Sequence, residues 1–301
     1  MITLREQRSS NFMGFFVRDK ATKRKKVRLP IFPIIFLSVV VLLSIIGPYV
    51  MPYNPVQGNM RDALTSPMGE SRSKAFHIMG TDHLGRDILS RIIGGARISV
   101  IIGVLSVGLA SFIGTIFAML AGYLGKWWER IIMRLTDVAM SMPFLMVALV
   151  FAAVLGSGIR NLILIFGLWT WPQYARVLRS EVLRLKESDY VKLAIIAGAS
   201  VPRIMIRHLL PNMVNTLMVL ATLQLGTVVI SEATLSFLGL GVQPPNPSWG
   251  LIIAQGRQYI TQAWWICLFP GIALMLFVMS CNMLGEWLRI KLDPSLRRTL
   301  T

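Results

Sequence analysis

Long uncharged stretches set the fold class of this chain. A helix needs roughly 20 apolar residues to cross the hydrocarbon core of a membrane. Such stretches cover residues 31–51, 98–125, 138–159, 161–175, 209–231 and 258–285. They are continuously apolar, whereas strands of a membrane β-barrel alternate polar and apolar residues over about 10 positions. We therefore predict an all-α integral membrane protein with six transmembrane helices.

The fourth stretch, residues 161–175, is the shortest. As a helix it spans only about 22 Å, so crossing requires Arg160 and Arg176 to extend outward from its ends. Prolines interrupt three of the predicted helices, at Pro143, Pro172 and Pro270. Each proline removes a helical hydrogen bond and can kink its helix, which is common in membrane helices and also suits spans that rearrange.

The charges lie between the apolar stretches and indicate the orientation. The formal net charge is +17, with 31 lysines and arginines. With an inside N-terminus, about three quarters of these cations fall on the inner side, as the positive-inside rule requires. Both termini are therefore predicted to be cytoplasmic, and the charge requires no nucleic-acid partner. The basic start resembles a secretory signal, but its apolar stretch is too long and lacks a cleavage site, so we favour an uncleaved anchor.

These boundaries divide the chain into four parts. Residues 1–28 form a cytoplasmic basic tail, and 29–97 form the first transmembrane helix and an outer loop. Residues 98–290 form the transmembrane core, with an inner hairpin at 185–210, and 291–301 form a cytoplasmic tail. From Arg86 onward the outer loop has a helical period, which predicts a short helix on the membrane surface. Glu232 falls near the outer end of the fifth stretch, where we favour structural hydrogen bonding over substrate contact.

Small residues recur at every fourth position of the second stretch: Ser106, Ala110, Gly114, Ala118 and Gly122. In lipid, such a ridge lets two helices approach closely. Glycine and alanine are also common in membrane helices, but five in register favour packing. The partner helix lies either in this chain or in another subunit.

The inner connection predicts a short helix, a turn at Gly198 to Ser200, and a second helix from Pro202. Proline suits a first helical position, and Ser200 can cap it. Small residues at positions 194 and 197–199 leave a low surface on which another protein could dock. The pattern alone leaves a plain amphipathic connector equally open.

This segment resembles the EAA loop of ABC importer permeases, whose pattern is Glu-Ala-Ala, three residues, Gly, and Leu-Pro about a dozen residues on. Ala194, Gly198 and the pair Leu210–Pro211 match in register, whereas Lys192 replaces the usual Glu and Leu193 the usual first Ala. Residues 80–91, 235–250 and 292–294 resemble the dipeptide, oligopeptide and nickel branch of these permeases. The combination is most similar to the C-type subunit of each permease pair.

The resemblance implies a subunit of a bacterial inner-membrane importer. A homologous permease would complete the translocation path, two cytoplasmic ATPases would bind ATP-Mg and accept the coupling helices, and a substrate-binding protein would deliver cargo outside. Residues expected to couple to the ATPase are Lys192, Ala194, Gly198, Ala199, Ser200 and Pro211. Residues expected at the outer face or a partner contact are Asp82, Arg86, Asp87, Arg91, Gly239, Gly241 and Trp249. The chain itself is expected to bind no cofactor.

A secondary transporter driven by an ion gradient is the main alternative. Such transporters usually carry acidic residues or unwound helices near the membrane midplane, and no predicted helix has a charge at its middle. A membrane enzyme is not indicated, because the chain lacks a Ser-His-Asp order, a His-Glu-x-x-His motif and a phosphate loop with lysine. The histidines and cysteines show no metal-ligand spacing. The cargo stays open among dipeptides, longer peptides, glutathione, opines and nickel chelates.

Overall fold

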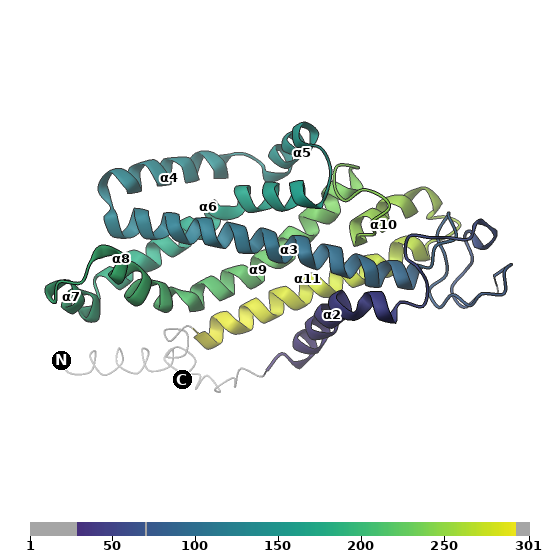
Figure 1. The fold of residues 1–301 in the computed structure, drawn as a ribbon, viewed down its shortest axis with the longest axis horizontal. Coiled ribbons are helices and arrows are strands. Elements are labelled where there is room, and N and C mark those ends of the chain that lie inside the picture. The colour runs from purple at the N-terminus through teal and green to yellow at the C-terminus, as the bar shows by residue number, and fades with distance from the viewer. Residues whose placement is uncertain (1–28, 70, 293–301) are drawn as a thin grey trace, which may run out of the picture.

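The computed structural model describes residues 29–69 and 71–292, and every regular element within them is helical (Figure 1). The five long helices are α2 (Ile31–Val50), α3 (Ile88–Met119), α6 (Ile159–Lys186), α9 (Leu210–Phe237) and α11 (Trp265–Leu292). The shorter helices are α4 (Lys126–Ser141), α5 (Phe144–Leu155), α7 (Asp189–Ile196), α8 (Val201–Ile204) and α10 (Trp249–Gly256). Single turns complete the chain: the 3₁₀ turns η1 (Met60–Asp62) and η4 (Arg257–Tyr259) and the π-helical segments η2 (Leu120–Leu124) and η3 (Met205–Leu209). The predicted basic tail 1–28 and residues 293–301 of the predicted C-terminal tail lie outside the described residues.

Among the described helices, four are long and apolar enough to cross a membrane: Ile31–Val50, Ile88–Leu124, Val201–Phe237 and Trp265–Leu292. The pair α4 and α5 passes the same test only together, which gives up to five spans. Helix α6 is continuous over 28 residues, but its second half carries several charges. The all-helical membrane class is confirmed, whereas the count of six spans stays a prediction.

Pro143 breaks the third predicted span. Helix α4 ends at Ser141, α5 begins at Phe144, and the two helices meet at 90°. Met142 has φ −92° and ψ 133°, the extended conformation that a residue before proline prefers. The interruption predicted at Pro143 is therefore a break between two helices rather than a kink within one.

The second span begins earlier than its uncharged stretch. A separate surface helix was predicted from Arg86, but Ile88 opens α3, which continues without a break to Met119. Asp87 sets this start, because its carboxylate accepts the backbone N–H of Ser90 at 2.8 Å. Helix α10, which follows the proline-rich stretch, was not predicted at all.

The small residues of α3 lie against α6 of the same chain. A Cβ atom added at Gly114 would lie 2.4 Å from Cβ of Tyr174 and 2.8 Å from the carbonyl oxygen of Trp171. One added at Gly122 would lie 2.7 Å from Cγ1 of Val182. Ser106, Ala110 and Ala118 are fully buried. The two backbones therefore approach as closely as side chains of this size allow, which is how helices associate in lipid.

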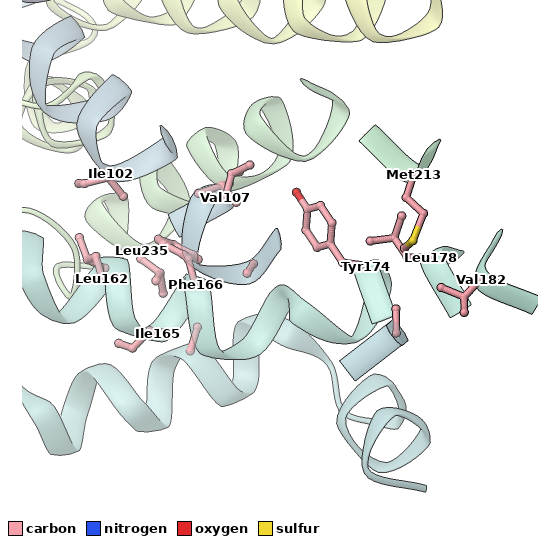
Figure 2. Packing of buried hydrophobic residues seen from close by; sticks show 14 of the residues in the cluster. Ile102, Val107, Leu162, Ile165, Phe166, Tyr174, Leu178, Val182, Met213 and Leu235 are labelled. Carbon is pink, nitrogen blue, oxygen red and sulfur yellow. The ribbon is translucent and has the colours of Figure 1, made fainter. Parts of the chain in front are cut away.

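A buried cluster extends this contact to α9. Figure 2 shows Val107 of α3, Phe166 of α6 and Leu235 of α9 among its members, with Leu178 and Met213 further along. The three helices therefore form one packed unit. It separates two ends of the molecule: α7 and α8 lie at one end, with the end of α11 on the same side, and the loop 51–87 and α10 lie at the other (Figure 1).

The α3–α6 contact predicts that a larger side chain destabilises the protein at Gly114 but not at Gly108. We expect Gly114→Val to destabilise the detergent-purified chain by about 1–3 kcal/mol, because the new methyl groups would overlap α6. Gly108→Val is the matched control on the same helix, since nothing lies within 4 Å of a Cβ atom there. Thermal unfolding followed by size-exclusion chromatography measures both, and equal unfolding temperatures would contradict the packing.

Candidate functional site

The α7–α8 hairpin connects α6 to α9 at one end of the bundle (Figure 1). Helix α7 ends at Ile196, and Gly198 follows with a φ of +75°, in the left-handed region that glycine tolerates. The N–H of Ala199 donates to the carbonyl of Ala194 at 3.0 Å, and the N–H of Gly198 donates to that of Ile195 at 3.0 Å. This pair of bonds is a Schellman motif. The structure therefore contains the predicted helix, turn and helix.

Buried side chains fix the hairpin to the bundle. Val191 of α7, Ile204 of α8 and Leu209 of η3 are at most 1% exposed. They belong to the same buried cluster as Leu178 and Met213 of the long helices. Because the hairpin shares the core of α6 and α9, a displacement of the hairpin is transmitted to both helices.

The opposite face of the hairpin exposes large aliphatic side chains. Ile196 is 81% exposed and Leu193 is 64% exposed. We call the full set the aliphatic tip: Leu193, Ile195, Ile196, Val201 and Ile206. Exposed charged residues surround it, namely Glu187, Asp189, Lys192, Arg203 and Arg207. Charges are costly in hydrocarbon, so this end is expected to lie in water.

The predicted coupling residues all lie on this hairpin or directly after it. Lys192, Gly198, Ser200 and Pro211 are exposed, and Ala194 and Ala199 are half-buried. Lys192 Nζ lies 3.2 Å from the Glu187 carboxylate with both side chains in solvent, so this pair contributes little. Ser200 precedes α8 as predicted, but its side chain makes no capping hydrogen bond.

A buried charge cluster holds the loop at the other end. The carboxylate of Asp82 accepts from Nε of Arg86 at 2.7 Å and also pairs with Arg91. Gln255 of α10 accepts from the guanidinium groups of Arg86 and Arg91 at 3.1 and 2.7 Å. We call these four residues the loop latch. Asp82 is fully buried, and a buried charge of this kind is tolerated only when it is paired and hydrogen-bonded.

Backbone hydrogen bonds and a tight turn explain why Asp82 and Arg86 are four residues apart. The N–H groups of Leu84 and Arg86 donate to the Asp82 carboxylate at 2.8 and 3.0 Å. The turn between them requires Gly85, whose φ is +70° and whose added Cβ would lie 1.9 Å from the carbonyl oxygen of Asn59. No other residue fits this position, so the glycine and the two charges act as one unit.

Two further carboxylates, outside the latch itself, hold other parts of the loop 51–87. Asp87 lies 3.0 Å from Nδ1 of His77 and caps α3. Asp62 accepts the backbone N–H of Ser73 at 2.9 Å. Burial opposes ionisation of Asp62, but hydrogen bonds from Ser73 and Ser71 outweigh it, so the pKa of this carboxyl is lowered. The hydrogen bonds from Ser73 and Ser71 therefore favour the ionised form of Asp62.

Indole groups tie the latch to the rest of the bundle. Nε1 of Trp265 donates to the carbonyl of Thr81 at 3.1 Å, and Nε1 of Trp249 donates to that of Ile92 at 3.0 Å. The first bond links α11 to the loop, and the second links α10 to α3. Gly250 also packs against α9, where an added Cβ would lie 2.4 Å from Cα of Ala233.

This geometry corrects the expected surface role of several residues. Asp82, Arg86, Asp87, Arg91, Gly241 and Trp249 are buried within the chain, and of the predicted outer contacts only Gly239 is exposed. The charged residues of the motif at 80–91 pair with one another and cap α3. Gln255 was missed, since an uncharged residue in an unpredicted helix carries no signal of its ionic partners.

Glu232 has the structural role that its position favours. Its carboxylate accepts from the hydroxyl of Ser236 at 2.7 Å and from that of Ser99 at 3.2 Å, and the side chain is fully buried. The bond from Ser99 links α9 to α3, whereas the bond from Ser236 lies within α9. Within the described part of the chain, no three histidine, cysteine, aspartate or glutamate side chains lie close enough together to hold a metal ion.

Comparison with known proteins gives one family and consistent relatives. The family described as binding-protein-dependent transport system inner membrane component matches residues 110–298. The di/tripeptide transport system permease protein DppC of Pseudomonas aeruginosa is 38% identical over 88% of this chain and 87% of its own length. The dipeptide transport system permease protein DppC of Alkalihalophilus pseudofirmus is 35% identical over 93% and 90%. The glutathione transport system permease protein GsiD of Escherichia coli is 39% identical over 87% and 85%.

The latch predicts a large loss of stability when its carboxylate is neutralised. Asp82→Asn leaves two buried guanidinium groups without a counter-charge, which costs about 3–5 kcal/mol when a buried pair is broken. Asp137→Asn is the control, because the Asp137–Arg176 pair is exposed on both sides and is worth less than about 1 kcal/mol. Thermal unfolding of the purified chain and limited proteolysis of residues 51–87 report the difference. A wild-type unfolding temperature for Asp82→Asn would rule out the latch.

Proposed function

The chain belongs to the family of binding-protein-dependent transport system inner membrane components, and we propose on this basis that it forms half of the path by which short peptides are imported. Its relatives are permeases of peptide or glutathione transport systems, so it is a non-catalytic membrane subunit and ATP hydrolysis belongs to separate subunits. An ion-gradient-driven transporter finds no support among them. The named substrates of the three relatives are all short chains of amide-linked residues, which favours peptides over opines or nickel chelates.

The aliphatic tip is the observation that carries the proposal. Its side chains are apolar and exposed, and the hairpin that carries them is anchored in the core that it shares with α6 and α9. The same segment carries exposed charged residues. We assign it to a groove on a cytoplasmic ATPase. When two ATPases close on ATP-Mg, each would move one hairpin, and the shared core would carry that motion into α6 and α9 as a rigid-body switch.

The remaining parts of the complex follow from this assignment. A homologous permease would supply the other half of the path, and a substrate-binding protein would dock at the end that carries the loop 51–87. The hairpin end would then be cytoplasmic, together with both termini. That orientation requires an even number of spans, and we take the number as six, with α4–α5 and α6 crossing as the third and fourth.

Lys192 occupies the position where the family pattern has glutamate. A groove that receives a cation there differs in charge from one that receives a carboxylate. We therefore expect the ATPase partner to offer an acidic or neutral residue opposite Lys192, while the apolar contacts of the tip supply most of the affinity.

The coupling role predicts a specific failure when the tip is charged. We expect Ile196→Asp combined with Leu193→Asp to reduce copurification of the ATPase subunits and ATP-dependent peptide uptake at least tenfold, since each lost 1.4 kcal/mol of binding is a factor of ten. Both side chains are exposed, so the isolated chain should unfold at its normal temperature.

Met68→Asp is the matched control, because Met68 is an apolar residue that is 72% exposed in the loop at the opposite end. It should copurify with the ATPases as the unaltered chain does. Normal copurification and uptake by the doubly charged hairpin would reject the coupling role. Uptake that persists without ATP would reject the importer itself.

A further inference from the structure

A cavity of about 270 Å³ lies beside the break between α4 and α5. Met140 and Met142 line it from the break, Gln173 lines it from α6, and Gln224 and Thr227 line it from α9. An engineered cavity of roughly 150 Å³ holds a benzene molecule, so this one has room for one or two amino-acid residues. No ionisable side chain contributes to its lining.

The polar groups of the cavity are left free for a ligand. Gln224 is only 9% exposed, and its carboxamide makes no hydrogen bond to any residue in the described part of the chain. Its amide atoms are not among the buried side-chain atoms that lack a partner, so they reach the open space of the cavity, where a ligand can contact them. The hydroxyls of Thr170 and Ser231 instead donate to carbonyls of their own helices, at 2.7 and 2.8 Å, which leaves their oxygen lone pairs available as acceptors.

The walls and the polar groups have complementary roles. A carboxamide presents two N–H donors and one carbonyl acceptor, which match the carbonyl and N–H of a peptide bond. Methionine side chains adapt to irregular shapes and are common at promiscuous binding surfaces. Such a lining recognises what all peptides share and accommodates side chains that differ. It offers no charge that would hold an ionic solute.

The cavity also lies on the helices that carry the hairpin. Gln173 belongs to α6, which leads into α7, and Gln224 belongs to α9, which follows η3. Movement of α6 against α9 therefore changes the separation of the two carboxamides. Met142 and Phe144, on the two sides of the 90° break at Pro143, form another part of the wall.

We propose that this cavity is the point in the translocation path where the chain binds a peptide backbone, with Gln224 and Gln173 as its hydrogen-bonding residues. The assignment rests on the proposed function and adds to it the residues that contact cargo. In this proposal the cavity selects peptides by their backbone amide groups and does not discriminate between their side chains.

The test uses the whole importer, reconstituted in vesicles with its second permease, ATPases and binding protein, and a radiolabelled tripeptide. Gln224→Met keeps the length of the side chain and removes its hydrogen-bonding groups. We expect the number of peptides imported per ATP hydrolysed to fall about fivefold to tenfold, the effect of one lost hydrogen bond. Gln224→Asn keeps a carboxamide and should recover part of the loss, which a merely structural role would not give.

Thr222→Val is the matched control on α9, since the Thr222 hydroxyl donates to Met218 of the same helix and does not line the cavity. A second measurement places a cysteine at Thr227 in a chain with Cys267→Ser and Cys281→Ser. Tripeptide with ATP should slow its reaction with a water-soluble thiol reagent at least threefold.

The outcomes separate the two proposals. Import by the unaltered complex together with unchanged ratios for Gln224→Met and Gln173→Met, or no protection of the cysteine, overturns the cavity assignment alone. An unaltered complex that imports no peptide overturns the proposed function, and the cavity assignment falls with it.

Discussion

The close approach of α3 and α6 is the constraint on which the structure depends. Lipid gives no hydrophobic force between two apolar helices, so they are held by contacts between atoms that touch. Gly114 and Gly122 make that contact possible by leaving room for Tyr174 and Val182. Helix α3 starts at the loop latch and ends beside the hairpin, where Lys186 of α6 donates to the carbonyl of Tyr123 at 3.0 Å. One interface therefore fixes the distance between the two ends at which partners would bind.

The two ends treat charge in opposite ways. Asp82, Arg86 and Arg91 are buried and joined through Gln255, and loss of the Asp82 carboxylate would leave both guanidinium groups without a counter-charge. On the hairpin, Lys192 pairs with Glu187 where both side chains are exposed, and such a pair breaks and re-forms at little cost. The loop therefore has buried ion pairs, whereas the hairpin has an exposed one.

Much of the fold follows from the sequence, and the failures have physical causes. The apolar stretches and the small-residue ridge were sufficient for the helical class, and Gly198 with Pro202 was sufficient for the hairpin. Hydropathy could not show that Pro143 bends its span by 90° or that Asp87 starts α3, because both depend on local backbone geometry. The charged motif at residues 80–91 was read as a contact surface, because a sequence does not reveal that Gln255 and Trp265 cover it. The free carboxamide of Gln224 is visible only once its neighbours are placed.

The aliphatic tip also bears on how such a protein is made. A chain inserted in the membrane before its ATPases arrive leaves five large aliphatic side chains in water. Apolar patches of that kind recruit chaperones or each other, and aggregation grows with the concentration of unassembled chains. If the ATPases cover the tip as proposed, assembly would remove these side chains from water, and an orphan copy would keep them exposed.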